Sequence, residues 1–295
     1  MHSDGFQPPP LAAAQVAIVG LGLMGGSLAA ALSSTQACRQ VVGIARRRST
    51  LTTALDLRFI HRGTADIQEG VREADIVILA TPVRDILARI KALGPILKPG
   101  SLLLDIGSTK KVICEALGAL PAHVQPVGGH PLCGKETSGL TMAEPTLYRD
   151  KVFVLSPLPR TSPAALALAQ SLVLAIGARP LILDPERHDR LVAAISHLPY
   201  LLAVTLVNAA EAMAQGDALA WKLAASGFRD TSRVAAGDLT MMLDILATNR
   251  TPILEALHHA QAQLAALTRY LEENDDSHLQ AALTAARNRR LEITS

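Results

Sequence analysis

The fold is decided by residues 16–28, which read VAIVGLGLMGGSL. Val16 to Val19 predicts a short buried strand, and Ser27 to Ser33 predicts a helix that follows a glycine-rich turn. The turn has the pattern G-x-G-x-x-G, in which the glycines permit a tight turn, close approach of a pyrophosphate and close helix–strand packing. The start of the helix adds free N–H groups that attract phosphate. The pattern therefore predicts a dinucleotide site made by Gly20, Gly22, Leu23, Met24 and Gly25, with a purely steric role for the glycines as the alternative.

Composition narrows the class of protein. The chain has 295 residues, which favours two domains, and 49% of them are hydrophobic, which is enough for a large core. The formal net charge of +2 is too small for a nucleic-acid or membrane-surface footprint. We therefore expect a globular protein with a small-molecule substrate, and no nucleic-acid or membrane partner.

The cysteines indicate a compartment and exclude a zinc or disulfide framework. Cys38, Cys114 and Cys133 are widely spaced and odd in number. They form no metal-binding or redox pair, so we expect no metal site and a reducing, cytoplasmic location.

Two segments need separate interpretation before the fold is assigned. Residues 1–14 lack the order of a secretory signal and are interpreted as a flexible N-terminal lead-in. Leu191 to Met213 is long and apolar enough to suggest a membrane span. It contains His197, Pro199 and Glu211, which are costly in lipid, so the sequence favours a buried helix.

Short apolar runs separated by helical spacings predict βαβ units over residues 15–185. The predicted strands are Val16–Val19, Val41–Ile44, Asp75–Leu79, Leu102–Asp105, Val124–Val127, Val152–Leu155 and Leu181–Leu183. These units predict an α/β, Rossmann-like, doubly wound parallel sheet that forms a dinucleotide-binding domain.

From about Pro185 the strand signals stop and Ala/Leu-rich helical periodicity takes over. The predicted helices are Glu186–Gln215, Ala218–Ser226, Leu239–Thr248, Thr251–Glu273 and Ser277–Arg290. Residues 186–295 are therefore expected to form an all-α domain for substrate binding and dimerisation. Its apolar faces favour a homodimer.

The end of the second predicted strand indicates which dinucleotide binds. NAD sites usually place an acidic residue there, but the chain has none between Asp4 and Asp56. The strand instead runs into Arg46, Arg47, Arg48 and Ser49. Arginine offers paired donors to a 2′-phosphate, so Arg46, Arg47 and Ser49 are predicted to select NADP. A solvated basic loop is the alternative.

Ligands of open α/β sheets lie beyond the carboxyl ends of the strands. Thr81 and Pro82 follow the third predicted strand, Ser108 follows the fourth, and His130 follows the fifth within the sequence GGHPLCG of residues 128–134. Thr81, Pro82 and Ser108 are therefore predicted to contribute to the cofactor site. A hydroxyl and an imidazole at this edge form a proton-handling pair beside a nicotinamide. Ser108 could instead cap the following helix, and His130 could be a hydrogen-bonded turn residue. Cys133 is interpreted as a small packing residue.

The helical half contributes two polar segments. Ser196-His197-Leu198-Pro199-Tyr200 places polar groups in an apolar helix, where a lone histidine is more often a core residue than a catalyst. Residues 227–233, GFRDTSR, are predicted to form a charged turn in which Arg229 and Asp230 pair. Arg233 is a candidate for binding a substrate carboxylate.

These motifs together resemble the prephenate/arogenate dehydrogenase family from about Val16 to the last helices. The resemblance rests on five segments in this order: residues 19–28, 105–110, 128–134, 196–199 and 227–233. The first is shared by many dehydrogenases, whereas the other four are specific together. The last segment and the Arg-rich end of the second strand are most similar to cyanobacterial NADP-dependent arogenate dehydrogenases.

The resemblance implies a reaction and roles for particular residues. It implies oxidative decarboxylation of arogenate to tyrosine with hydride transfer to NADP. His130 would accept the proton of the ring hydroxyl and Ser108 would lie near that hydroxyl and the nicotinamide. Arg233 would bind a substrate carboxylate. His197, near the domain junction, would support substrate binding, and Tyr200 would lie near the side chain of the substrate. Relatives that favour prephenate usually have histidine where this chain has Tyr200, so arogenate is favoured.

Three alternatives remain open at this point. The chain could be a prephenate dehydrogenase or a dual cyclohexadienyl dehydrogenase. A β-hydroxyacid dehydrogenase would share the architecture, but no lysine here is followed by Asn or Asp four residues later, as that class requires. A non-catalytic NADP-sensing protein would use the nucleotide fold without needing His130 or Arg233.

Overall fold

The structure is a computed structural model and describes residues 8–135 and 137–294. It divides into two compact units, Met1–Asn249 and Arg250–Ser295, which are considered separately. Of the expected N-terminal lead-in over residues 1–14, the first seven residues lie outside the described part. The rest is more ordered than expected, because Leu11–Ala13 form a 3-10 turn and Ala14 is fully buried.

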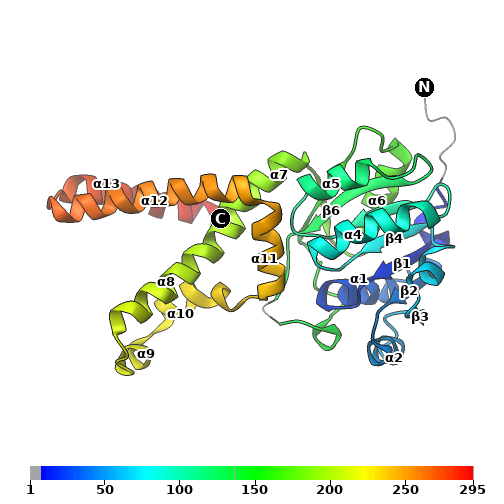
Figure 1. The fold of residues 1–295 in the computed structure, drawn as a ribbon, viewed down its shortest axis with the longest axis horizontal. Coiled ribbons are helices and arrows are strands. Elements are labelled where there is room, and N and C mark those ends of the chain that lie inside the picture. The colour runs from blue at the N-terminus through cyan, green and yellow to red at the C-terminus, as the bar shows by residue number, and fades with distance from the viewer. Residues whose placement is uncertain (1–7, 136, 295) are drawn as a thin grey trace. The chain divides into compact units, whose positions relative to one another are not determined.

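The first unit is built on an eight-stranded sheet of order β3-β2-β1-β4-β5-β6-β7-β8 (Figure 1). Every neighbouring pair is parallel except β6 and β7, which run antiparallel. The strands are β1 (Gln15–Val19), β2 (Gln40–Ile44), β3 (Arg62–Thr64), β4 (Ile76–Leu79), β5 (Leu102–Asp105), β6 (Gln125–Pro131), β7 (Val152–Pro157) and β8 (Arg179–Ile182). The order 3-2-1-4-5-6 is that of the doubly wound dinucleotide-binding fold, and confirms the predicted fold class.

Helices cover both faces of this sheet, which explains why its central strands β1, β4 and β5 are buried at every position. Val16 and Ile18 of β1 pack into one core with α1 (Leu23–Ser34), α2 (Arg48–Asp56) and α6 (Pro163–Ala175). Ala17 and Val19 pack into a second core with α3 (Ile67–Val71), α4 (Val83–Leu93) and α5 (Lys111–Gly118).

Three features of the sheet differ from the sequence prediction. The short strand β3 was missed, because its sequence Arg-Gly-Thr has no apolar run. Helix α1 begins at Leu23, four residues before the predicted start. Its first turn contains Gly25 and Gly26, which are poor helix formers and hid this start in the sequence. Strand β6 continues through His130 to Pro131, because these residues pair with β7 on the antiparallel side. His130 therefore lies in a strand and not in a turn.

The long apolar helix predicted after Pro185 is one helix with a wider turn inside it. It consists of α7 (Pro185–Val192), a π-helical turn (Ala193–His197) and α8 (Leu198–Ala214). Pro199 lacks the N–H that would continue the regular bonding, which explains a π-turn at this point. His197 ends the π-turn, and such turns occur often at functional sites.

The expectation that this helix is buried is met only in part. Residues 185–214 are long and apolar enough to cross a membrane by length and composition, and 28% of the most apolar window is buried in the chain. Ile195 and Met213 are largely exposed, and Leu202 is partly so. One such helix is weak evidence for a membrane span. Its exposed apolar side chains are, however, typical of a surface that packs against another protein surface.

The segment of residues 226–236 is helical, which corrects the predicted charged turn. It forms α10 (Ser226–Ser232) and the 3-10 helix η5 (Arg233–Ala236). The hydroxyls of Thr231 and Ser232 each donate to a carbonyl four residues earlier, at 2.7 Å, so these polar side chains are compatible with a helix. Arg229 and Asp230 are neighbours in the sequence of this helix, and side chains at successive helical positions do not face each other, which disfavours the predicted pair.

The remaining helices of the first unit are α9 (Leu219–Leu223) and α11 (Leu239–Thr248). Helix α11 packs on α4, and its Asp244 accepts a hydrogen bond from the backbone N–H of Arg84 at 3.0 Å. This contact fixes α11 to the nucleotide-binding sheet.

The second unit is a hairpin of two helices, α12 (Arg250–Glu272) and α13 (Asp276–Thr294). Asn274 has a left-handed backbone with φ of 53° and ends the first helix. Leu264, Leu271 and Leu283 are each more than half exposed, so this hairpin presents an apolar surface.

Candidate functional site

The glycine-rich turn has the geometry of a phosphate-binding loop. Gly20 has φ of +102°, and a side chain there would lie 2.6 Å from the carbonyl oxygen of Ala80. A Cβ on Gly25 would lie 1.9 Å from the carbonyl oxygen of Gly20, so helix α1 can pack this close only with glycine. A Cβ on Gly22 would meet nothing within 4 Å. Packing therefore requires two of the glycines, and the third opens on space where a ligand can approach the backbone.

The start of α1 faces the same space with its backbone and not with its side chains. Gly22 caps the helix, and the N–H groups of Leu23, Met24 and Gly25 belong to its first turn, where no intrahelical acceptor exists. The side chain of Leu23 is buried in the core, and the carbonyl of Met24 accepts a hydrogen bond from Tyr148 at 2.7 Å. These residues can therefore contribute main-chain donors and the positive end of the helix dipole.

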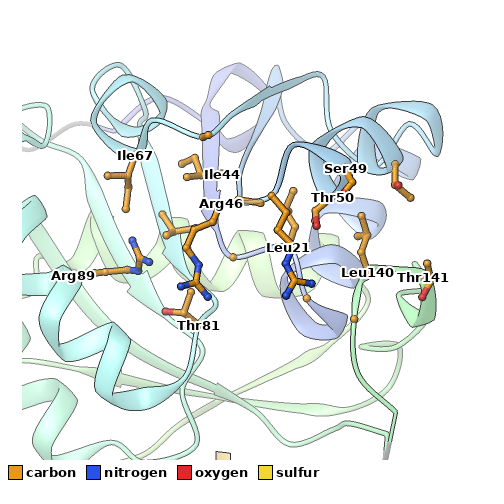
Figure 2. Close-up of a pocket in the computed structure, with 18 residues that line it drawn as sticks. Leu21, Ile44, Arg46, Ser49, Thr50, Ile67, Thr81, Arg89, Leu140 and Thr141 are labelled. Atoms are coloured by element: carbon orange, nitrogen blue, oxygen red, sulfur yellow. The ribbon is translucent and has the colours of Figure 1, made fainter. Parts of the chain in front are cut away.

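A cavity of about 600 Å³ lies over this turn (Figure 2). This volume is in the range of small-molecule and cofactor sites. Six predicted cofactor residues line it: Gly20, Gly22, Arg46, Arg47, Ser49 and Thr81. The predicted residues Leu23, Met24, Gly25, Pro82 and Ser108 are not part of its lining. Among the described residues that line it, none is Asp or Glu.

Arg89 of α4 also lines this cavity and was missed by the sequence analysis. Figure 2 shows the side chains of Arg46 and Arg89 in the same part of the cavity. Arg89 forms an ion pair with Asp85 one turn earlier. Burial alone would raise the pKa of Asp85, but the hydrogen bond from Arg89 and the charges of Arg89 and Arg46 lower it overall. Asp85 therefore carries a negative charge that keeps Arg89 in place.

His130 stands at the head of a chain of hydrogen bonds. Its Nδ1 lies 2.8 Å from Nε2 of His188 on α7, and Nδ1 of His188 lies 2.8 Å from Oδ1 of Asp189. Both members of the second pair are almost fully buried. The two imidazole rings meet edge to face, with centroids 5.0 Å apart. Of these three hydrogen-bonded residues, His130 alone was predicted from the sequence.

Asp189 also caps helix α5. Its carboxylate accepts the backbone N–H of Lys110 at 2.7 Å and that of Lys111 at 2.9 Å. The alternative considered for Ser108, that its hydroxyl caps this helix, is therefore not needed. Ser108 lies in the turn between β5 and α5, and its predicted role near the substrate stays a prediction.

A buried ion pair closes the network behind His130. The amine of Lys110 binds Oδ2 of Asp105, and neither side chain is exposed. Oδ1 of Asp105 accepts the backbone N–H of Gly129 at 3.0 Å. Gly129 directly precedes His130 on β6. The network therefore begins at the His130 side chain, passes through His188, Asp189, Lys110 and Asp105, and returns to β6 at the N–H of Gly129. This ring holds the backbone and the side chain of His130 together.

His197 belongs to a branch of the same network. The amide nitrogen of Asn249 donates to the carbonyl of Asp189 at 2.7 Å and lies 3.2 Å from Nδ1 of His197. Burial lowers the pKa of His197 to about 4. The charge of Asp189 acts in the opposite direction and raises this pKa, whereas the nearby His188 lowers it further. Burial, followed by the nearby His188, Lys110 and His197, also holds the pKa of His130 well below its ordinary value. Both rings are therefore neutral at pH 7.

The other predicted substrate residues lie on neighbouring helices. Tyr200 is buried on α8, and its ring carbon Cε2 would lie 3.7 Å from a Cβ at Gly237, just after η5. Arg233 begins η5 and is exposed. Helix α8 packs on both α10 and η5. Tyr200 and Arg233 therefore lie on elements that pack together, and their substrate contacts stay predictions.

The fold and the cavity define a dinucleotide-binding α/β protein with a neutral histidine at the sheet edge. Comparison with known families narrows this class. The family model for the prephenate dehydrogenase nucleotide-binding domain matches residues 28–182, and that for its dimerization domain matches residues 184–285. The chain therefore belongs to the prephenate/arogenate dehydrogenase family.

Individual relatives agree over most of their length. A prephenate dehydrogenase of Bacillus subtilis is 32% identical over 266 residues, which is 90% of this chain and 72% of the relative. A crystal structure of prephenate dehydrogenase from A. aeolicus, in complex with hydroxyphenyl propionate and NAD⁺, superposes with a TM-score of 0.88 at 29% identity and covers 95% of this chain and 98% of that one. Synechocystis arogenate dehydrogenase gives a TM-score of 0.82 at 31% identity and covers 95% and 99%.

Proposed function

We propose that the chain oxidises arogenate to tyrosine, with loss of carbon dioxide and transfer of a hydride to NADP⁺. The observation that carries this proposal is that one sheet bears both an arginine-lined cavity, with no Asp or Glu among its described lining residues, and a neutral, hydrogen-bonded His130 on β6. Family membership supports the reaction class.

Preference for NADP rests on the charge of the cavity. Arg46 and Arg47 supply guanidinium groups at the end of β2, and Arg89 adds a third from α4. A 2′-phosphate would be attracted by these cations, whereas the 2′-hydroxyl of NAD would lack the carboxylate that usually binds it. Ser49, at the start of α2, adds a hydroxyl donor.

The cofactor residues fit a dinucleotide, which when bound supplies a hydride acceptor at its nicotinamide ring. Gly22 and the first turn of α1 would hold the pyrophosphate on main-chain N–H groups. Thr81 and Pro82 follow β4, at the point of the sheet where the strand order reverses. This is the position at which ligands bind in open α/β sheets.

His130 would act as the general base on the ring hydroxyl of the substrate. Its lowered pKa keeps the ring neutral, so it can take up the proton as the carbinol becomes a carbonyl. Ser108, in the turn between β5 and α5, would hydrogen-bond the same hydroxyl and orient it. Loss of carbon dioxide then makes the ring aromatic and the reaction effectively irreversible.

The anionic substrate would be bound from the helical side. Arg233 would bind a carboxylate, and the guanidinium group can do so with two parallel hydrogen bonds. His197 would support the site through Asn249 and Asp189. Relatives that favour prephenate usually have histidine at the position of Tyr200. This difference supports arogenate over prephenate.

Prephenate dehydrogenase, or dual cyclohexadienyl dehydrogenase, is the second candidate. It is favoured by the similarity to the prephenate dehydrogenases of Bacillus subtilis and A. aeolicus, the latter solved with NAD⁺. The similarity to Synechocystis arogenate dehydrogenase supports the first candidate. A non-catalytic NADP sensor remains the outcome to exclude by assay.

We also propose that the chain works as a homodimer in the cytoplasm. The family's dimerization domain matches residues 184–285. Leucine and isoleucine side chains on this part of the chain are exposed, among them Ile195, Leu264 and Leu271. A second copy would cover such surfaces. Light scattering should give twice the chain mass of 31.1 kDa, and a monodisperse monomer at micromolar concentration would contradict the proposal.

The decisive assay crosses arogenate and prephenate with NADP⁺ and NAD⁺ and follows nucleotide reduction by absorbance. We expect the highest kcat/KM with arogenate and NADP⁺. Faster turnover of prephenate would assign the second candidate, and no turnover in any combination, with NADP⁺ still bound, would assign the sensor.

A further inference from the structure

The pair His188–Asp189 stands behind His130, and neither residue was assigned a role by the sequence motifs. The two side chains are almost fully buried, and each touches the next member of the chain at 2.8 Å. In a row of buried groups linked by hydrogen bonds, the donor and the acceptor of each bond can be assigned, because an atom is either the donor or the acceptor in a given bond. This assignment can be worked out from the far end of the row.

Asp189 fixes the far end as an acceptor. Its carboxylate receives the N–H groups of Lys110 and Lys111 at the start of α5, and main-chain N–H groups can only donate. Oδ1 of Asp189 also faces Nδ1 of His188, and an ionised carboxylate has no proton to give. Nδ1 of His188 therefore carries the proton and donates it in this bond.

This assignment determines the state of the next two nitrogens. We take His188 as neutral in the inference that follows. Only one nitrogen of a neutral imidazole carries hydrogen, so Nε2 of His188 is then an acceptor. The Nδ1 of His130, 2.8 Å away, must then be the donor. The remaining nitrogen of His130, Nε2, is left with its lone pair. It is the only ring nitrogen of the pair that can accept a proton from a substrate.

We propose that His188 and Asp189 are positioning residues that hold His130 in the tautomer with hydrogen on Nδ1, so that Nε2 is the base. Asp189 orients His188, and His188 orients His130. As His130 becomes positively charged, its Nδ1–H bond to His188 strengthens, and the carboxylate beyond His188 stabilises the charge. The assignment of the catalytic step rests on the proposed function, whereas the tautomer itself does not.

A purely structural role is the competing explanation, because Asp189 caps α5 and His188 fills space between α7 and the sheet. The two explanations differ in what a substitution does to His130. A structural residue affects stability, whereas a positioning residue affects the tautomer of His130 and kcat but leaves the affinity for nucleotide unchanged.

The test compares His188→Leu with His188→Gln. Leucine removes the acceptor, so Nδ1 of His130 loses its partner. Glutamine can accept from His130 through its carbonyl and donate to Asp189 through its amide, so it preserves the direction of the chain. His123→Leu serves as a matched control, since it removes a histidine whose ring bonds to a backbone carbonyl, that of Leu97 at 3.2 Å, and that belongs to neither the network of His130 nor the cavity.

Nitrogen NMR of histidine-labelled protein reads the tautomer directly, and His130→Asn assigns the signal. In the wild type and in His188→Gln we expect Nδ1 of residue 130 protonated and Nε2 unprotonated at pH 7.5. In His188→Leu we expect a mixture or the opposite tautomer. A wild-type signal with Nε2 protonated, or an unchanged tautomer in folded His188→Leu, would overturn the inference.

Kinetics with the better of the two substrates supply the second measurement. We expect His188→Leu to lose at least about 100-fold in kcat, the lower end of what base catalysis contributes, with the Kd for NADP⁺ within two-fold of wild type. His188→Gln should recover most of that loss, and His123→Leu should resemble wild type. Equal loss in the leucine and glutamine variants would overturn the positioning role. Wild-type protein with the expected tautomer but no turnover would refute the proposed function and leave the tautomer assignment standing.

Discussion

Asp105 and Lys110 form an ion pair in which neither side chain reaches solvent, at the end of β5, the strand that pairs with the one that carries His130. Asp105 uses its two oxygens to bind Lys110 and the N–H groups of Gly107 and Gly129. The pair therefore joins the end of β5 to the backbone just before the proposed base. Removing one partner would leave an uncompensated buried charge.

Lys110→Met should lower the free energy of unfolding by about 3–5 kcal/mol, as expected when one partner of a buried ion pair is lost. Urea unfolding measures this loss. Lys135→Met is the control, because its partner Glu144 and Lys135 itself are both about a third or more exposed, and such pairs contribute about 1 kcal/mol or less. Equal effects of the two substitutions would show that burial of the pair is unimportant.

Stability should fall as the pH is lowered from 7.5 to 5. The pKa of His197 is about 4 in the folded protein and 6.5 in a model peptide. Its folded pKa is the lower one, so the unfolded chain takes up the proton first and stability decreases from about pH 6.5 towards pH 4. This histidine alone should account for roughly 2 kcal/mol at pH 5. His130 contributes in the same direction, since its pKa is also lowered.

Urea unfolding at both pH values, in the wild type and in His197→Gln, isolates this contribution. The variant should lose less stability between pH 7.5 and pH 5 than the wild type does. The same pH dependence in both proteins would mean that His197 is not held neutral by the fold.

The double variant Arg46→Ala and Arg47→Ala should raise the KM for NADP⁺ by about 10-fold or more, because hydrogen bonds to a charged group contribute about 1.5–3 kcal/mol. The KM for NAD⁺ should change little. Arg48→Ala is the matched control, since Arg48 belongs to the same basic run but does not line the cavity. A parallel rise for both nucleotides would argue against recognition of the 2′-phosphate.

Arg233→Ala should raise the KM for the substrate by about 10-fold or more, with a smaller effect on kcat and none on NADP⁺ binding. Arg229→Ala, one turn earlier on the exposed side of α10, should resemble wild type. Steady-state kinetics with arogenate measure both. An unchanged KM in the first variant would remove Arg233 from the binding site.

Much of the sheet could be predicted from the sequence, because buried parallel strands are short apolar runs that end at a glycine or a polar residue. Val16 to Val19 and Leu102 to Asp105 show this pattern, and both are strands in the structure. Strand β3 could not be predicted, because Arg62 and Gly63 form an edge strand that has no apolar signature. Its existence depends on pairing with β2.

The candidate site was predicted where function follows a strand and missed where it depends on tertiary contacts. Gly20, Arg46 and Thr81 follow strands, and all three line the nucleotide cavity. His188 and Asp189 lie in the sequence Pro-Glu-Arg-His-Asp-Arg, which is typical of an exposed helix start. Only the packing of α7 on α5 buries these two side chains and places them behind His130.

Helix α10 was predicted as a turn because its local composition is typical of a loop. Gly227 and the hydroxyls of Thr231 and Ser232 are typical of loops, yet both hydroxyls bond to carbonyls within the helix. Local composition competes here with packing against α8, and the packing prevails.

The most direct test of the account is the His130→Asn variant, assayed for turnover of arogenate and for binding of NADP⁺ in the same preparation. Asparagine can keep a hydrogen bond but cannot accept the proton, so we predict a loss of about 10²–10⁴-fold in kcat with an unchanged Kd for NADP⁺. Wild-type turnover in this variant would contradict the central claim that the imidazole at position 130 is the base.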